Sequence, residues 1–347
     1  MGTGNESTMV GMSESEVTSL VVNFAFYCVV GTPVILTNAF LLATILRHAA
    51  LRNRKEFVLI AAVGFFDTLP YGISNIGAGA YRIPRLLDNR YMLPTNRLSC
   101  ALTLHVSTWF LGSTLSCLGL VMLSADRLLA VKWPLTYRKL SKKYAWSVVG
   151  FVLTFSFVVY TLLLYGAAGS EDTVTQLCWT GEGAVPSDYH RQYVLNTFLS
   201  VLSVLLYCLV WFEAIKVSPA STGAQQTNKN ADLVWQKKLT RAVGISCLCT
   251  FLLLIVPLTV IHIFSYFPWL YDRFVGWIHL IICCNPICNL IIYVSKQKEI
   301  RKGFVALIKC KTLPPNLQLW HQQTTKIVSS RQTASKPEGD GIQQIVA

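Results

Sequence analysis

Residues 20–46 read LVVNFAFYCVVGTPVILTNAFLLATIL and contain no charged side chain. A helix needs about 20 apolar residues to cross roughly 30 Å of hydrocarbon, and this run is longer than that. A surface helix of a soluble protein carries a polar face, and the strands of membrane barrels are about ten residues long with alternating polarity. The run therefore predicts a helix that spans a membrane.

Six further runs of the same kind follow along the chain. They are residues 57–80, 100–123, 145–164, 194–212, 242–264 and 274–294. Asp67 is the one charged side chain inside the seven runs. Only 14% of the chain is charged, whereas soluble domains have roughly a quarter. We therefore predict an all-α membrane protein built as a seven-transmembrane helix bundle.

Lys and Arg in the loops indicate the orientation of the bundle, because they are enriched on the cytoplasmic side. Six of the 30 Lys and Arg lie before the first run or in the loops that follow runs two, four and six: Arg82, Arg85, Arg90, Arg97, Arg191 and Arg273. The rest lie in the alternate segments, so we expect the amino terminus outside. The net charge of +13 then marks the cytoplasmic face, and no nucleic-acid partner is predicted.

The remaining segments flank this bundle. We divide the chain into an extracellular segment (1–19), the bundle (20–296), a short amphipathic cytoplasmic helix, helix 8 (297–310), and a disordered cytoplasmic tail (311–347). Ile300, Phe304 and Ile308 recur at four-residue spacing, which gives helix 8 one apolar face for the membrane surface. Anionic lipids of the inner leaflet would attract the basic residues around it.

Several residues are candidates for covalent modification. Asn5 begins the glycosylation sequon Asn-Glu-Ser in the outer segment. Of 11 cysteines, only Cys100 and Cys178 fall at or beyond the outer surface, so each is the other's natural partner for a disulfide; two unpaired thiols are the alternative. Cys310, after helix 8, is a candidate for palmitoylation, with an unmodified thiol as the alternative.

The end of the third run carries the most specific motif. Asp126-Arg127 is followed by Pro134, seven residues after the arginine, and by Tyr137. This string resembles the rhodopsin-like (class A) G-protein-coupled receptors, whose third helix ends in Asp-Arg-Tyr; Leu128 replaces that Tyr here. The resemblance implies that Arg127 is held by Asp126 in a closed bundle and meets a heterotrimeric G protein when released.

The sixth run fits the same family with departures. Phe251 precedes Pro257 by six residues, as in the kinked helix that moves outward on activation in this family. Ile255 stands where the family usually has an aromatic toggle. Lys237 occupies the position of the carboxylate that normally pairs with the arginine of the third helix, so Arg127 is expected to rely on Asp126.

The seventh run offers two registers for the family's Asn-Pro-x-x-Tyr motif. We prefer Asn289 to Tyr293, with Leu290 in place of the proline, because Tyr293 then has the usual spacing to helix 8. The alternative register begins at Asn285-Pro286.

Asp67 occupies the acidic position of the family's second helix, where a buried carboxylate is costly and marks a functional site. The resemblance implies a polar network of Asn38, Asp67, Ser116, Asn285 and Asn289. In this family such oxygens can hold a structural sodium ion; a protonated Asp67 in a hydrogen-bond network is the alternative. No other metal or cofactor is predicted.

The outer halves of the runs supply a candidate ligand pocket suited to a small or peptidic ligand. Its residues are Tyr71, Asn75, His105, Trp109, His262, Trp277 and His279. Trp109 stands where amine receptors of the family carry Asp, which argues against a biogenic amine. The seventh run has no Lys, and Cys283 lies near the position of the retinal-binding lysine, so the protein is not an opsin.

The loosened motifs look most like the nematode serpentine chemoreceptors of class SX. The implied function is binding of an extracellular chemical or peptide, followed by nucleotide exchange on a G protein, with arrestin and a receptor kinase acting on the tail. No catalytic motif is present, so an enzyme is not expected. A neuropeptide receptor is the first alternative and a transporter the second, although the sequence shows no repeated halves. The expected location is the plasma membrane, with a sensory cilium as a narrower option.

Overall fold

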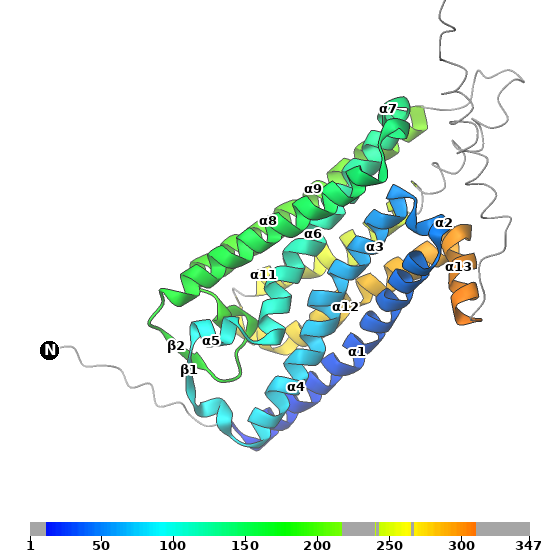
Figure 1. Ribbon diagram of the computed structural model, residues 1–347. Helices are drawn as coiled ribbons and strands as arrows, with labels where there is room; N and C mark the ends of the chain where they lie inside the picture. Colours follow the sequence, from blue (N-terminus) through cyan, green and yellow to red (C-terminus); the bar gives the residue numbers. More distant parts are fainter. Residues whose placement is uncertain (1–11, 217–239, 241–242, 265–266, 310–347) are drawn as a thin grey trace, which may run out of the picture.

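The computed structural model describes residues 12–216, 240, 243–264 and 267–309. Among these residues, seven helices are long and apolar enough to cross a membrane, which confirms the predicted bundle. They are Glu14–Arg47, Lys55–Leu87, Leu104–Lys132, Lys142–Ala168, Pro186–Glu213, Val243–Ile261 and Phe274–Lys296. They lie alongside one another in an elongated bundle (Figure 1).

The long helices carry the following labels. They are α1 (Glu14–Arg47), α3 (Lys55–Thr68), the π-turn η1 (Leu69–Ile73), α4 (Ser74–Leu87), α6 (Leu104–Lys132), α8 (Lys142–Ala168), α9 (Pro186–Lys216), the π-turn η4 (Phe251–Ile255), α11 (Val256–Phe264) and α12 (Pro268–Lys296). The short elements are α2 (Ala49–Arg52), the 3-10 turn η2 (Arg90–Met92), β1 (Pro94–Asn96), α5 (Arg97–Ala101), α7 (Pro134–Lys139), β2 (Thr173–Thr175), the 3-10 turn η3 (Thr180–Gly183) and α13 (Lys298–Ile308).

Helix α1 begins earlier than the apolar run predicts. Ser13 forms a capping box in which its hydroxyl accepts from the backbone N–H of Glu16, while the Glu16 carboxylate accepts from the backbone N–H of Ser13 at 2.8 Å. These bonds satisfy backbone groups that a helix start leaves unpaired. The helix therefore begins at Glu14, inside the segment that the sequence analysis assigned to residues 1–19.

The second span contains a π-turn where Pro70 removes a backbone donor. The helix continues beyond the predicted end at residue 80, as α4, to Leu87. Gly112 of α6 packs directly onto this turn: a Cβ on Gly112 would lie 2.5 Å from Cδ of Pro70 and 2.7 Å from Cβ of Leu69. The absence of a side chain at Gly112 thus sets the close approach of the two helices.

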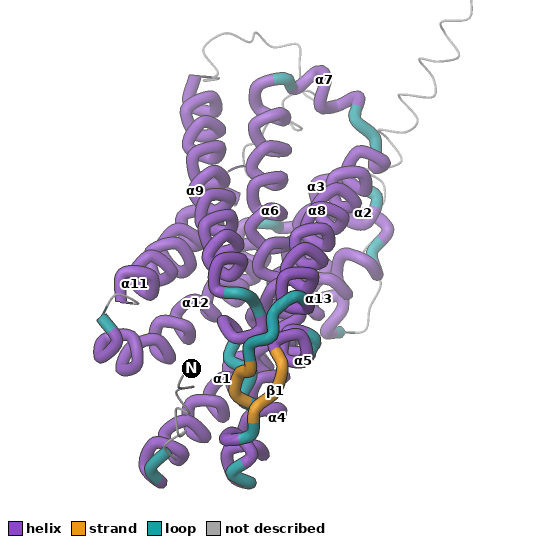
Figure 2. The backbone as a smooth tube through the Cα atoms, turned by 90° about the vertical axis from the view of Figure 1, so that its left-hand side faces the viewer, coloured by secondary structure: helices purple, strands orange, loops and turns teal. Residues whose placement is uncertain are grey.

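One end of the bundle carries the pair of short strands (Figures 1 and 2). Strands β1 and β2 are antiparallel, with Thr95 opposite Val174. The third span does not start at Cys100 as predicted. Cys100 lies in the separate helix α5, and a turn precedes α6, which begins at Leu104.

The opposite end carries α2, α7 and α13 (Figure 1). Helix α13 confirms the predicted amphipathic segment, but its buried face is formed by Ile300, Gly303 and Ala306. Ile308 is exposed, and Phe304 contacts the ring of Phe40 on α1 with centroids 6.1 Å apart. Gly303 is buried because α1 and α2 pass closely over it, and small residues permit that approach.

Helix α6 lies at the centre of the bundle and contacts α3, α4, α8 and α9. Its inward face is buried along most of its length. Helix α6 carries Trp109 near its outer end, Ser116 about two turns further on and Arg127 about three turns beyond that, so it connects the outer end of the bundle to the cytoplasmic end.

Candidate functional site

At the cytoplasmic end of α6, Asp126 and Arg127 form a fully buried ion pair. The Nε atom of Arg127 donates to Oδ2 of Asp126 at 3.0 Å, and its Nη2 atom donates to the same oxygen. Burying two charges costs solvation energy that their contact must offset, so such a pair has to be well hydrogen-bonded. The geometry agrees with the pairing that the resemblance implies for a closed bundle.

Tyr137 of α7 provides a second contact for the arginine. Nη2 of Arg127 donates to the phenol oxygen of Tyr137 at 2.8 Å. That oxygen also lies 3.2 Å from Oδ2 of Asp126 and 3.3 Å from Oε1 of Glu56, so its one proton serves either carboxylate in turn. Burial raises the pKa of Tyr137 well above its ordinary value, which keeps this proton in place.

Two residues at the start of α3 complete the group. Glu56 faces the phenol of Tyr137, and Lys55 donates to the backbone carbonyls of Tyr137 and, at 3.0 Å, of Leu140. The ammonium of Lys55 also lies 3.7 Å from the centre of the Tyr137 ring. We call Lys55, Glu56, Asp126, Arg127 and Tyr137 the arginine cluster; each member is at most 9% exposed.

The predicted polar network lies deeper in the bundle, and all five of its residues are buried. Ser116 and Asn289 lie beside the Asp67 carboxylate. Asn38 packs against Gly64 of α3, where a Cβ would lie 3.2 Å from its Oδ1 atom. The structure thus brings α1, α3, α6 and α12 together around one buried acid.

Helices six and seven meet through hydrogen bonds between polar side chains. Oγ1 of Thr250 donates to Oδ1 of Asn285 at 3.1 Å, and the Ser246 hydroxyl donates to Oδ1 of Asn289. Tyr293 is buried one turn further along α12. Asn285 and Asn289, which begin the two possible registers of the Asn-Pro-x-x-Tyr motif, therefore both face the interior.

The structure places Phe251 of the sixth span on the outer side of its helix. Phe251 is 38% exposed, whereas Leu254 and Ile255 face inward. The π-turn η4 explains the difference, because it adds a residue to the helical turn and rotates the positions before Pro257. Pro257 is the second residue of the regular helix α11.

Four of the predicted pocket residues do lie together, and Tyr27 of α1 joins them. Nε2 of His279 and Oδ1 of Asn75 are 2.9 Å apart. The ring of His279 lies 5.4 Å from that of Trp109 and 4.9 Å from that of Tyr27, and Trp109 stands edge-on to Tyr71. We call Tyr27, Tyr71, Asn75, Trp109 and His279 the outer cluster.

The other predicted pocket residues lie elsewhere. Trp277 is 66% exposed on the outer surface of α12, so its assignment to the pocket is wrong. His105 is buried, but its Nε2 atom lies 3.1 Å from the carbonyl oxygen of Cys178 and its ring packs on Tyr81. His262 falls within α11, and its side chain lies outside the described residues.

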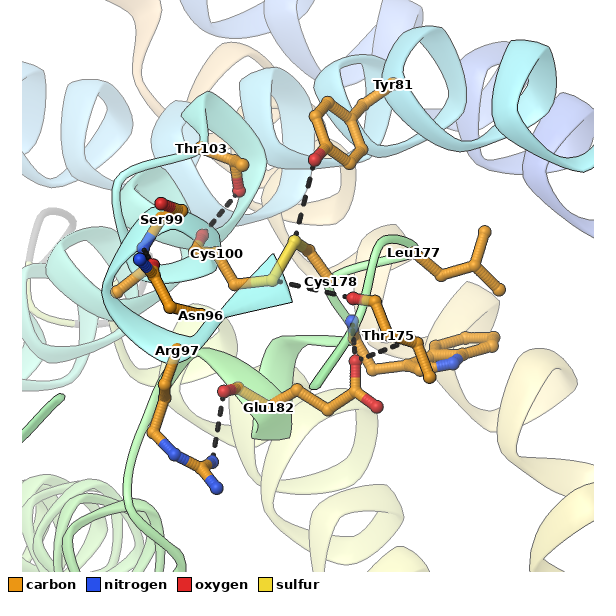
Figure 3. Close-up of a disulfide and its surroundings, with 12 residues drawn as sticks. Tyr81, Asn96, Arg97, Ser99, Cys100, Thr103, Thr175, Leu177, Cys178 and Glu182 are labelled. Atoms are coloured by element: carbon orange, nitrogen blue, oxygen red, sulfur yellow. Dashed lines mark hydrogen bonds between the residues drawn. A yellow bond between two sulfur atoms is a disulfide. The ribbon is translucent and has the colours of Figure 1, made fainter. Parts of the chain in front are cut away.

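The predicted disulfide between Cys100 and Cys178 is confirmed, and it joins α5 to the loop after α8 (Figure 3). Glu182 braces this loop: its Oε2 atom accepts from the hydroxyl of Thr175 at 2.9 Å and from the backbone N–H of Trp179 at 3.0 Å. The loop is thereby held in one conformation at the outer end of α6.

Arg82, predicted only as a charge in an outer loop, fixes the same loop from α4. Its Nε atom donates to the carbonyl of Leu177 at 2.9 Å and its Nη2 atom to that of Cys178 at 2.7 Å. The guanidinium also lies beside the rings of Phe24 and Trp179, 5.0 and 4.9 Å from their centres. Arg82 is 3% exposed, so this charge is part of the packed interior.

Some predicted sites fall outside the described residues. These are Asn5, Lys237, Cys310 and the tail beyond it. The polar network and the arginine cluster, by contrast, are both described, and sequence reasoning missed Lys55 and Glu56 in the latter. A Lys-Glu pair at a helix start is common at a membrane surface, so the sequence offered no distinctive signal for them.

Residues 80–293 match the family model described as 7 transmembrane receptor (rhodopsin family), which covers more than half of the 347 residues. The match runs from α4 to Tyr293 and includes Asp126 and Arg127. Among curated proteins, none matches this chain.

Proposed function

Because the chain belongs to the rhodopsin family of seven-transmembrane receptors, we propose that it binds an extracellular ligand and promotes nucleotide exchange on a cytoplasmic heterotrimeric G protein. It is a multi-pass membrane receptor and not an enzyme. The observation that carries the G-protein proposal is Arg127, a buried cation at the cytoplasmic end of the central helix, held by Asp126 and Tyr137.

The mechanism that we propose is a shift between two bundle arrangements. In the closed one, described here, Arg127 is covered by Tyr137. In the open one, the cytoplasmic part of helix six moves away and Arg127 offers its donors to a G-protein helix. Pro257 and the π-turn η4 supply the bend, because both interrupt regular helical hydrogen bonding.

For the ligand, we propose a small chemical or a peptide that contacts the outer cluster. The support is its position beside α6 and its mixture of aromatic rings with the amide of Asn75 and the imidazole of His279. Such a mixture combines apolar contact area with a few oriented polar groups. A ligand that displaces the His279–Asn75 contact would act on both α4 and α12.

The narrower assignments are further proposals. The departures at Leu128, Ile255 and Lys237 favour a chemosensory receptor similar to nematode class SX, and a neuropeptide receptor is the alternative. We also propose the plasma membrane or a sensory cilium as its location and arrestin and a receptor kinase as partners. The cell type that expresses the receptor separates the two roles, because a ciliated sensory ending favours chemicals and an interneuron favours a peptide.

A sodium ion is proposed beside Asp67. The buried hydroxyl of Ser116 lies next to the Asp67 carboxylate, so the buried acid has a neutral oxygen atom beside it. Oxygen atoms suit a hard cation, and Asp67 and Ser116 would hold it. The ion would supply positive charge to a buried acid and so favour the closed bundle.

The test of the G-protein proposal is nucleotide exchange. The receptor is expressed with a panel of Gα subunits, and exchange is measured without ligand and with a panel of small chemicals and peptides. We expect Arg127→Ala to reduce exchange to the receptor-free level while the protein still reaches the surface. Lys139→Ala is the control, because Lys139 is an exposed cation on α7 outside the arginine cluster. Undiminished exchange by Arg127→Ala would remove the arginine from the mechanism.

A further inference from the structure

We propose that Lys55 and Glu56 of α3 hold α7 over Arg127 and thereby keep the receptor silent without ligand. The inference rests on the proposed function only in that release of Arg127 is taken to permit signalling. It assigns Glu56 as a positioning residue that acts on Arg127 through Tyr137. The carboxylate of Glu56 and the arginine are joined by one phenol group.

The charges of the arginine cluster support this role. It contains two cations, Lys55 and Arg127, and two carboxylates, Glu56 and Asp126, all buried. A buried charge that loses its partner is costly, so each carboxylate stabilises the arrangement of both cations. The phenol of Tyr137 can donate its hydrogen bond either to Glu56 or to Asp126. When it donates to Glu56, Asp126 accepts from Arg127 alone.

Lys55 acts on the backbone of α7. Its ammonium donates to the carbonyls of Tyr137 and Leu140, which lie at the carboxyl end of that helix, where a positive charge is favourable. A helix of 6 residues is not stable by itself in water. The position of α7 therefore depends on contacts of this kind. Glu56 contacts the side chain of Tyr137, and Lys55 contacts the backbone carbonyls of Tyr137 and Leu140.

The position of α7 controls access to the arginine. Arg127 is 0% exposed, and the phenol of Tyr137 is bonded to its guanidinium. A partner helix can reach these donors only after Tyr137 has moved. By the resemblance, Lys237 occupies the helix-six position where a carboxylate normally pairs with the arginine. Lys237 has the same charge as Arg127 and cannot form that ion pair. The contacts described for Arg127 come from Asp126 on its own helix and from Tyr137 of α7, and Glu56 of α3 accepts a hydrogen bond from that same Tyr137.

The first experiment measures α7 directly and needs no G protein. Full-length receptor in lipid nanodiscs is studied by hydrogen exchange, with Glu56→Gln, Tyr137→Phe and the wild type compared. Both substitutions keep the side-chain shape: Glu56→Gln removes the negative charge of the group that accepts from the phenol, and Tyr137→Phe removes the hydroxyl that contacts Arg127. We expect the amides of residues 136–140 to exchange about tenfold faster in both variants. Glu299→Gln is the matched control, since it removes a carboxylate on the same side of the membrane from α13.

The second experiment asks whether Glu56 acts through Tyr137. The double variant is compared with each single one, in hydrogen exchange and in ligand-free nucleotide exchange. We expect each single variant to raise basal nucleotide exchange severalfold and the double variant to add little to Tyr137→Phe. Additive effects, or exchange of residues 136–140 equal to that of the wild type, would overturn the proposal. If no Gα subunit responds, the proposed function fails, and hydrogen exchange still decides the role of Glu56.

Discussion

At the scale of single residues, Arg82 shows how a loop charge becomes part of the interior. Its guanidinium donates to two carbonyls of the loop after α8 and lies beside two aromatic rings. Lysine carries the same charge but cannot donate in this forked geometry. We expect Arg82→Lys to lower the free energy of unfolding by about 2 to 3 kcal/mol, since hydrogen bonds to charged groups are lost. Thermal unfolding of the purified receptor in detergent measures the change.

Arg90 provides the comparison for Arg82. Its contact with Asp88 is 3.6 Å long, and both side chains are more than half exposed. Exposed pairs of this kind contribute at most about 1 kcal/mol, so Arg90→Lys should leave the unfolding temperature almost unchanged. Equal losses in the two variants would mean that the contacts of Arg82 are not what holds the loop.

At the scale of elements, the contact between α6 and the π-turn η1 depends on Gly112. A methyl group there would overlap Pro70 and Leu69, which belong to a rigid turn. Overpacking of this kind costs about 1 to 3 kcal/mol, so Gly112→Ala should unfold at a lower temperature. Gly150→Ala is the control, because a Cβ at Gly150 of α8 would meet no atom within 4 Å. There the higher helix propensity of alanine should leave stability unchanged or slightly raised. If Gly150→Ala unfolded at a lower temperature than Gly112→Ala, the contact at Gly112 would not be what limits the approach of α6 to the π-turn η1.

The elements themselves were largely predictable from the sequence. A run of apolar residues long enough to cross a bilayer predicts a helix whatever surrounds it, and each of the seven runs overlaps one of the seven long helices of the described residues. Their ends were less predictable, because caps and loop packing set them. Ser13 starts α1 early, and α4 continues past the membrane-length run to Leu87, where Arg82 is buried by the loop it holds.

At the scale of the whole molecule, the sequence could not say which side of each helix faces inward. Lipid tails are as apolar as a protein interior, so hydrophobicity does not separate the two faces of a membrane helix. Trp277 was assigned to the pocket, although its side chain is exposed. Buried polar residues were more informative: Asp67, Asn285 and Asn289 are all in the interior, as predicted. Glu56 and Tyr137 are 81 positions apart, and only the packing of α3 against α7 brings them together.

The polar network around Asp67 connects four helices, so an ion there would act on the whole bundle. If Asp67 and Ser116 hold sodium, sodium at about five times its dissociation constant should stabilise the receptor by about 1 kcal/mol relative to potassium. Thermal unfolding in matched sodium and potassium chloride measures this difference, and Asp67→Asn should abolish it because the ligand charge is lost. Asp88→Asn, which removes an exposed carboxylate from the loop after α4, should retain it. A sodium effect that survives Asp67→Asn would place the ion elsewhere, and no difference between the salts in the wild type would favour a protonated Asp67 within a hydrogen-bond network.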